Sequence, residues 1–298
     1  MSRRPVLRRP QPETNVARSM NPIVQRYDAG AAEYARYWAP VLEHTAERLI
    51  DEVDAVFRGD RLRIVDVGSG TGTVALAALR RWGHAEVTAT DAAAGMLDFA
   101  RGRAEEAGLA ADGRLTFAVG PADELPVPTG SFDVAVSSFV LQLVPDRLAA
   151  LTEIRRVLRP TGLLAYVTWL DRDSREPFRA AEQFDEAVYD LEIDEPEEAD
   201  EPIAGDVRSP RTAADELRRA GFIRASAREE TLIYDWSMET YLEYKLAYDE
   251  RALLSTLSDE QRRELERNAR ARLARLAPSD FRWHAPVVVA RAFAPEQA

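Results

Sequence analysis

The sequence predicts a doubly wound α/β fold, in which a mostly parallel, seven-stranded sheet is covered by helices on both faces. From residue 59 onward, short apolar strands alternate with amphipathic helices of about 10–15 residues. A glycine-rich turn at 68–72 separates the first strand from the first helix of this alternation. With 46% hydrophobic and 30% charged residues among 298, the chain has ample apolar material for a core. We therefore expect one α/β domain with additions.

Two segments precede the alternation. Residues 1–12 combine four arginines with three prolines, and such a stretch predicts a mobile arm because it can neither hold a helix nor bury apolar area. Residues 13–58 are predicted to form an N-terminal helical layer, since Tyr34, Trp38 and Leu42 recur at helical spacing.

Residues 59–170 form the predicted core of the domain. Its glycine-bounded, β-branched runs predict strands at 62–68, 86–91, 114–120, 132–139 and 162–170. The amphipathic stretches between them predict helices at 71–82, 93–107 and 146–158. This alternation is typical of a parallel sheet buried on both faces.

Beyond residue 170 the rhythm loosens into additions around two further strands. The predicted units are an acidic helical insert and loop (171–208), a core helix and strand (209–236), a helical cap (237–281), and a final strand with a tail (282–298). Within the cap, residues 237–277 are predicted to be wholly helical. This stretch is too long for a simple connection, so we expect it to act as a lid.

Charge and cysteine content exclude several classes of protein. The chain carries 39 Lys and Arg against 51 Asp and Glu, a net charge of −12. Residues 171–206 account for all of this excess, and no basic stripe remains elsewhere, so nucleic acid is not an expected partner. The absence of cysteine excludes disulfides and thiolate chemistry, and we read the acidic run 192–201 as a solvated loop and not a metal site.

The distribution of apolar residues along the sequence bears on the cellular location of the protein. No apolar run reaches the roughly 18 residues that a membrane span needs. We therefore expect no membrane partner and a cytoplasmic protein.

The glycine-rich turn is the most informative motif. Asp66 precedes the loop Gly68-Ser69-Gly70-Thr71-Gly72, at the strand edge where open α/β sheets bind ligands. Thr73 stands where a dinucleotide-binding loop requires Gly or Ala, and no Gly-Lys-Ser/Thr ending follows. An acid at position 66 repels phosphate but can order the loop and receive an ammonium group. The loop therefore favours a nucleoside that carries an amino acid.

The motif VDVGSGTG (65–72) resembles motif I of the class I S-adenosylmethionine-dependent methyltransferases. The similarity continues through Asp91, then residues 121–146 and 153–167, and is strongest to the ubiquinone-biosynthesis-type, small-molecule branch. The resemblance implies a Rossmann-like methyltransferase fold and S-adenosyl-L-methionine as the cofactor, with a small-molecule acceptor.

The resemblance also implies roles for individual residues. The glycine loop would hold the methionine part of the cofactor with support from Asp66, and Asp91 would bind the ribose hydroxyls. The remaining cofactor-binding positions are Ala92 and Met96 against the adenine, Ala122 and Asp123 at its edge, Ser138 and Phe139 at the methionine portion, and Tyr27 and Tyr34 as a cover. Pro121 departs from the family pattern, because it offers neither a carboxylate nor an N–H group.

Each of these residues also has a purely structural interpretation. Asp66 could hydrogen-bond only loop amides, and Asp91 could cap the following helix. Ser138 and Phe139 could belong to the core, and Tyr27 and Tyr34 could simply pack on an apolar helix face.

The sequence does not assign a catalytic residue. A sulfonium methyl group is already activated, so alignment of the acceptor is the main contribution expected of the enzyme. His44, His284 and Gln142 are candidates for a base or an acceptor-orienting group, whereas His84 precedes a strand and lies at the wrong end of the sheet.

The acceptor itself is predicted from the additions to the core. We expect the insert 175–206 and the cap, with its aromatic residues, to build a largely apolar acceptor pocket. The leading hypothesis is methyl transfer to O, C or N of a small, mostly apolar molecule. The alternatives are a non-methylating reaction on the same fold, such as a cyclisation, and a non-catalytic cofactor-binding protein.

Overall fold

The computed structural model describes residues 21–171, 178–193 and 203–296, so the predicted arm 1–12 lies outside the described residues. Its centre is a seven-stranded sheet with the strand order β3-β2-β1-β4-β5-β7-β6. The strands are β1 (Arg63–Val67), β2 (Glu86–Asp91), β3 (Leu115–Val119), β4 (Phe132–Ser138), β5 (Leu158–Trp169), β6 (Ile223–Asp235) and β7 (Arg282–Phe293). The predicted doubly wound sheet is confirmed.

Strand direction fixes where a ligand crevice forms. Strands β1 to β5 pair in parallel, and β7 pairs antiparallel with both β5 and β6. The chain runs outward from β1 through β2 to β3, and then returns to place β4 on the other side of β1. The connection after β1 therefore leads to one side of the sheet, and the connection into β4 leads to the other side. This reversal of strand order opens a crevice at the carboxyl ends of β1, β2 and β4.

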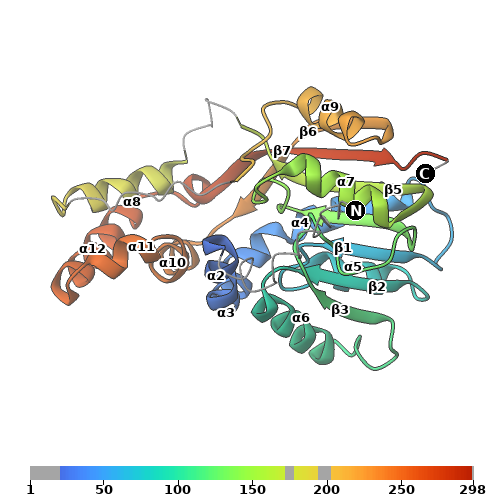
Figure 1. The fold of residues 1–298 in the computed structure, drawn as a ribbon. Coiled ribbons are helices and arrows are strands. Elements are labelled where there is room, and N and C mark those ends of the chain that lie inside the picture. The colour runs from blue at the N-terminus through green and yellow to red at the C-terminus, as the bar shows by residue number, and fades with distance from the viewer. Residues whose placement is uncertain (1–20, 172–177, 194–202, 297–298) are drawn as a thin grey trace, which may run out of the picture.

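Two layers of helices cover the sheet (Figure 1). One face carries α4 (Ala39–Asp54), α5 (Thr73–Arg81) and α6 (Ala94–Glu106), and the other carries α7 (Arg147–Val157) and α9 (Pro210–Arg219). Neighbouring residues of β4 and β5 divide between the two cores: Val134 and Leu163 belong to the first, and Ala135 and Leu164 to the second. This alternation is why the strands read as continuous apolar runs.

The N-terminal segment forms a small layer of its own above the crevice. It contains α2 (Pro22–Ala29), α3 (Ala31–Glu33) and the π-helical η1 (Tyr34–Trp38). The Asn21 side chain accepts a hydrogen bond from the Ile23 N–H group, and Pro22 follows at the first helical position, a combination that starts a helix. Their apolar residues pack with Ala93 and Met96 in a third cluster, separate from the two sheet cores.

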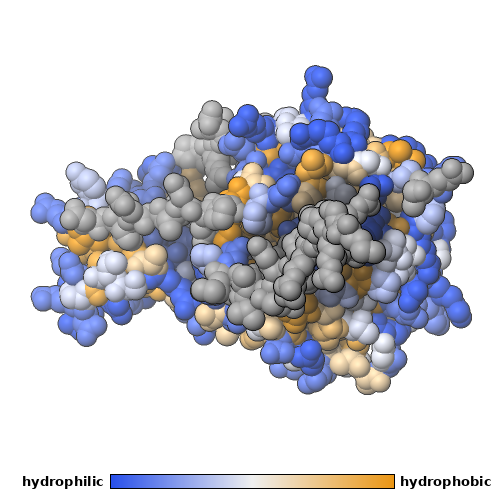
Figure 2. All heavy atoms as spheres, in the orientation of Figure 1, coloured by the Kyte–Doolittle hydropathy of each residue, from blue (hydrophilic) through white to orange (hydrophobic). Residues whose placement is uncertain are grey.

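The C-terminal additions form a lobe that projects from one end of the sheet (Figure 1). It holds α8 (Arg179–Tyr189), α10 (Met238–Tyr244), η2 (Lys245–Asp249), α11 (Arg251–Thr256), α12 (Asp259–Leu273) and η3 (Pro278–Phe281). Strand β6 runs from the core toward the lobe, and the antiparallel strand β7 returns from the lobe to the core. Figure 2 shows mainly hydrophilic residues along the outer edges of the visible face.

The prediction that 237–277 is wholly helical is wrong in detail. The chain widens to a π-helix in η2 and leaves the helix at Glu250 and Leu257. The second break has a local cause, because Ser258 forms a capping box with Gln261 and so starts a new helix there. None of the helices among the described residues is long and apolar enough to cross a bilayer.

Candidate functional site

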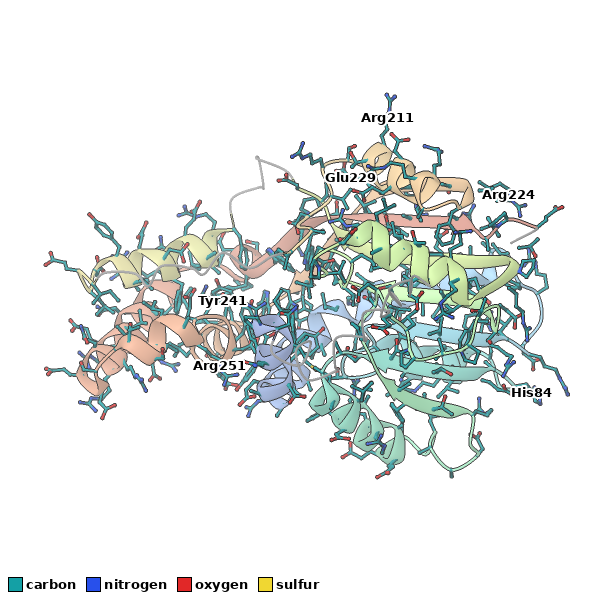
Figure 3. The ribbon with its side chains drawn as sticks, viewed as in Figure 1. His84, Arg211, Arg224, Glu229, Tyr241 and Arg251 are labelled. Atoms are coloured by element: carbon teal, nitrogen blue, oxygen red, sulfur yellow. The ribbon has the colours of Figure 1, made fainter. Side chains whose placement is uncertain are left out.

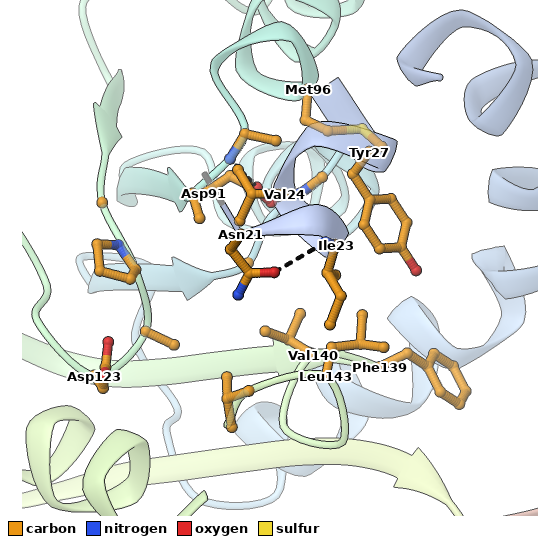
Figure 4. A pocket seen from close by; sticks show the side chains of 18 of the residues that line it. Asn21, Ile23, Val24, Tyr27, Asp91, Met96, Asp123, Phe139, Val140 and Leu143 are labelled. Atoms are coloured by element: carbon orange, nitrogen blue, oxygen red, sulfur yellow. Dashed lines mark hydrogen bonds between the residues drawn. The ribbon is translucent and has the colours of Figure 1, made fainter. Parts of the chain in front are cut away.

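A cavity of about 150 Å³ lies at the carboxyl ends of β1, β2 and β4. One water needs roughly 10–15 Å³ of such space, so the cavity accommodates a ligand of many atoms. Asn21, Ile23 and Val24 of the N-terminal layer line one side (Figure 4). Val140 and Leu143, from the loop after β4, line the opposite side. The pocket thus lies between segments more than 100 residues apart in the sequence.

The glycine loop forms part of the pocket because its backbone adopts conformations that disfavour other residues. Gly68, Gly70 and Gly72 have φ angles of 68°, 53° and 83°, in the left-handed region. A Cβ atom on Gly68 would lie 2.2 Å from a methyl group of Val140. Gly68 and Gly70 line the pocket, and the Tyr34 ring lies beside Gly70, 3.9 Å from where its Cβ would stand.

Asp91 ends β2 and lines the pocket. Its Oδ2 accepts a hydrogen bond from the Gly70 N–H group at 2.8 Å, and its Oδ1 accepts one from the Ala93 N–H group at 2.9 Å. Burial raises the pKa of the Asp91 carboxyl group, and these amide donors oppose the rise. The Ala92 N–H group also lowers this pKa by hydrogen bonding, and because an ionised carboxylate accepts about four hydrogen bonds, acceptor capacity remains for a ligand. The predicted capping contact to Ala93 and a ligand contact are therefore compatible.

Asp66 lies beneath the loop and does not line the pocket. Its Oδ2 accepts a hydrogen bond from the Ala75 N–H group at 2.9 Å, in the first turn of α5, where the N-cap residue Gly72 has no side chain to offer. Its Oδ1 is buried without a hydrogen-bond partner among the described residues. Burial raises the pKa of this carboxyl group to about 7.

The other predicted loop residues also lie behind the pocket surface. The Ser69 hydroxyl is buried and has no partner among the described residues. Thr71 is buried, and its backbone carbonyl accepts a hydrogen bond from the Arg103 guanidinium at 3.0 Å. Gly72 packs toward Ala100 of α6. Of the five predicted loop residues, the structure places only the first and third, Gly68 and Gly70, on the cavity wall.

The remaining positions predicted to bind a cofactor all line the cavity. They are Tyr27, Tyr34, Ala92, Met96, Ala122, Asp123, Ser138 and Phe139. The two tyrosine rings pack edge to face with their centroids 5.8 Å apart. Burial, followed by the neighbouring tyrosines, raises the pKa of Tyr34 well above its usual value, so this phenol stays neutral.

None of the three candidate catalytic residues lines the cavity. His44 is exposed on α4, and His284 is half-buried on β7, which the antiparallel register carries beyond the end of β5. Gln142 is buried, but its amide nitrogen donates to the Phe139 carbonyl at 2.7 Å and its oxygen accepts from the Thr168 hydroxyl at 2.9 Å. The expectation that Gln142 orients an acceptor is therefore wrong, because its side chain stabilises the loop after β4.

The described residues of the insert and the cap do not line this cavity, and the acceptor pocket that these segments are expected to build stays a prediction. His84, as expected, lies at the opposite end of the sheet from the lobe (Figure 3). Sequence reasoning missed Asn21, Ile23 and Val24. The Asn-Pro helix start was the signal that could have found them, but the sequence does not show that this helix folds back over the glycine loop.

Residues 64–162 match the family model described as a methyltransferase domain. The chain is 35% identical over 153 residues to a malonyl-acyl-carrier-protein O-methyltransferase of Xylella fastidiosa, a match that covers 50% of this chain and 46% of the relative. It is also 42% identical over 101 residues to the ubiquinone/menaquinone biosynthesis C-methyltransferase UbiE of Methylobacterium nodulans, covering 34% of this chain and 39% of the relative. The chain thus spans about half the length of the curated relatives it matches first.

The likeness to solved structures extends over nearly the whole fold. The crystal structure of the cyclase SpnF superposes with a TM-score of 0.57, at 18% identity, over 92% of this chain and 95% of that one. At this identity the likeness concerns the fold alone. The sheet, the glycine loop and the matched domain together define a Rossmann-like α/β fold with a methyltransferase domain at its centre. Residues 64–162 are thus identified as a methyltransferase domain, and the curated relatives that match this core are named as methyltransferases.

Proposed function

We propose that this protein transfers a methyl group from S-adenosylmethionine to O, C or N of a small, largely apolar molecule. Support for the cofactor comes chiefly from Asp91, a buried carboxylate at the end of β2 that lines the cavity with acceptor capacity left for a ribose hydroxyl. Support for the reaction comes from relatives named as O- and C-methyltransferases that match the same core.

The residues present in the pocket fit this cofactor. Apolar side chains of Ile23, Val24 and Met96 offer an adenine an apolar surface, and Ala122 and Asp123 lie at its proposed edge. The open backbone at Gly68 and Gly70 suits the amino-acid tail. Two polar groups beneath the loop, the Asp66 carboxyl group and the Ser69 hydroxyl, each keep a buried oxygen without a protein partner among the described residues, which is suited to an ordered water behind the pocket wall.

Catalysis in this proposal rests on positioning. When bound, S-adenosylmethionine supplies an already activated methyl group. Histidine is absent among the described residues that line the cavity, and Tyr34 keeps its proton because burial raises its pKa. What the protein contributes is a mainly apolar pocket that holds the cofactor and an acceptor in line, and such alignment is worth up to about 7–11 kcal/mol of barrier.

The test is the affinity for S-adenosylhomocysteine of the wild type and of Asp91→Ala, measured by titration calorimetry. A hydrogen bond to a charged group contributes about 1.5–3 kcal/mol, so its loss should weaken binding roughly tenfold to 100-fold. Asp98→Ala is the matched control, because Asp98 is an exposed acid on α6 that pairs with Arg101. Equal affinity of Asp91→Ala and the wild type would contradict the proposed cofactor site.

Turnover distinguishes the proposed reaction from a cyclisation on the same fold. Methyl transfer releases one S-adenosylhomocysteine for each product molecule. Product formed without S-adenosylhomocysteine would favour the non-methylating alternative.

A further inference from the structure

Aromatic rings extend from the pocket toward the projecting lobe. Phe139 lines the pocket, and its ring centroid lies 4.0 Å from that of Trp169. Trp169 in turn lies 6.3 Å from Trp38 and 5.8 Å from Trp283, between ring centroids. We refer to Trp38, Trp169 and Trp283 as the tryptophan cluster. It begins where the proposed cofactor pocket ends.

The tryptophan cluster is assembled from three parts of the fold. Trp38 ends η1 of the N-terminal layer, Trp169 ends β5, and Trp283 lies near the start of β7. Tyr244 of α10 stacks on Trp38 with the centroids 5.5 Å apart and the planes 16° apart. The sheet edge, the N-terminal layer and the cap therefore meet at these rings.

The burial of the cluster differs from that of a core. Trp82 and Trp236 are 3% and 7% exposed, whereas all three tryptophans of the cluster are only half-buried. The Trp82 indole N–H group donates to Asp54, but no indole N–H group of the cluster donates to another residue among those the structure describes. Half-buried rings gathered with unused donors form a surface on which a ligand can pack.

Backbone strain marks the junction between the pocket and the cluster. Phe139 has a φ of 54°, in the left-handed region that bulky residues rarely adopt. Its N–H group donates to the Val167 carbonyl at 2.9 Å, which ties this conformation to β5. Strain of this kind gathers at ligand sites. The left-handed conformation of Phe139 places its ring on the pocket wall and against Trp169 at the same time.

The charged groups near the cluster are already paired. Lys245 is buried, and its ammonium donates to Asp249 at 2.6 Å and to Glu250 at 2.5 Å. The Tyr244 hydroxyl donates to Asp249 at 2.7 Å. No ionic group in this set is left to hold a charged acceptor, so recognition here relies on ring faces and neutral donors.

We propose that the tryptophan cluster forms a wall of the acceptor site, and that the acceptor is a planar, conjugated molecule with hydrogen-bond-accepting oxygens. This inference rests on the proposed methyl-transfer function. Flat apolar rings stack on such a molecule, and indole N–H groups donate to its oxygens. The acceptor site then adjoins the cofactor pocket through Phe139.

Equilibrium dialysis of the full chain, loaded with S-adenosylhomocysteine, tests this inference with two probes. Flavone is planar and conjugated and carries oxygen acceptors, whereas decan-2-one is apolar and flexible. The wild type should bind flavone at least about tenfold more tightly than decan-2-one. Each of Trp38→Leu, Trp169→Leu and Trp283→Leu should weaken flavone binding about tenfold or more.

The controls separate the two proposals. Tyr189→Leu removes a ring that is 84% exposed on α8 and should bind flavone as the wild type does. Trp169→Phe keeps a ring at the same place and should retain most of the affinity. Unchanged S-adenosylhomocysteine affinity in every variant, measured by calorimetry, verifies the fold and the cofactor site independently. Flavone binding that is absent from the wild type, or unaffected in all three leucine variants, would overturn the acceptor proposal and leave the cofactor proposal intact.

Discussion

Asp66 combines full burial with an incomplete set of hydrogen bonds, and its ionisation therefore opposes folding. Its pKa rises from 3.8 to about 7 because burial disfavours the charge, and one oxygen has no partner among the described residues. Between about pH 4 and pH 7 the unfolded chain releases this proton while the folded chain keeps it. The free energy of unfolding of the wild type therefore falls as the pH rises through this range and levels off above it.

Asp66→Asn should remove this penalty while still offering an oxygen to the Ala75 N–H group. We expect the variant to be more stable than the wild type above about pH 7, by at most roughly 4 kcal/mol at about 1.4 kcal/mol per pKa unit. The difference should shrink steadily toward acid pH. Urea unfolding across this pH range measures it, with the exposed Asp98→Asn as the control. A gain that did not vary with pH would show that ionisation of Asp66 is not its cause.

Elements of the structure depend on single backbone positions, and the glycine loop shows this at Gly68. Here φ is 68°, and a Cβ would lie 2.2 Å from a methyl group of Val140, which packs directly against the loop and lines the same pocket. Gly68→Ala must therefore strain the loop and push Val140 away. We expect a loss of about 1–3 kcal/mol in the free energy of unfolding, together with a clear loss of S-adenosylhomocysteine affinity.

Gly83→Ala provides the matched comparison. No heavy atom lies within 4 Å of the place that a Cβ on Gly83 would take, and this residue does not adopt a positive φ. The change should therefore leave both stability and affinity nearly unchanged. Thermal or urea unfolding measures the stability of the two variants, and calorimetry measures their affinity for S-adenosylhomocysteine. If both variants bound the ligand equally well, the close approach of the loop to Val140 would have no part in the site.

The elements that the sequence predicted well are those with local signals. The strand 86–91 and the helix 146–158 follow from apolar periodicity, and the structure places both within one residue of the predicted bounds, with Asp146 as the N-cap of the helix. Gln142 shows what periodicity cannot supply. Its side-chain amide hydrogen-bonds to Phe139 and Thr168, and Thr168 lies on β5, so the role of Gln142 depends on a tertiary contact that one sequence does not show.

The same limit applies to the pocket as a whole. The glycine loop and Asp91 are adjacent through the βαβ topology, which the sequence predicts. The cover over them depends on helix α2 returning across the sheet edge, where the Asp28 carboxylate accepts a hydrogen bond from the Gly95 N–H group at 2.6 Å. That contact joins residues 67 positions apart, and the spacing of neither segment indicates it.

At the scale of the whole molecule, the N-terminal layer should respond to the ligand more than the sheet does. Helix α2 packs mainly in the small cluster with Ala93 and Met96, outside the two sheet cores, so it can open without unfolding them. Its residues Ile23, Val24 and Tyr27 line the pocket, so an open α2 loses its contacts with the ligand.

Hydrogen exchange of the full chain with and without S-adenosylhomocysteine measures this coupling. At about 100 times the dissociation constant, binding favours the closed form by about 2.7 kcal/mol, which corresponds to slowing exchange in α2 by up to roughly 100-fold. Helix α9 lies on the opposite face of the sheet and should change little. In Asp91→Ala the protection of α2 should disappear at the same ligand concentration. Equal protection of α2 and α9 in the wild type would instead indicate that the ligand stabilises the molecule only as a whole, and that α2 does not act as a separate cover over the pocket.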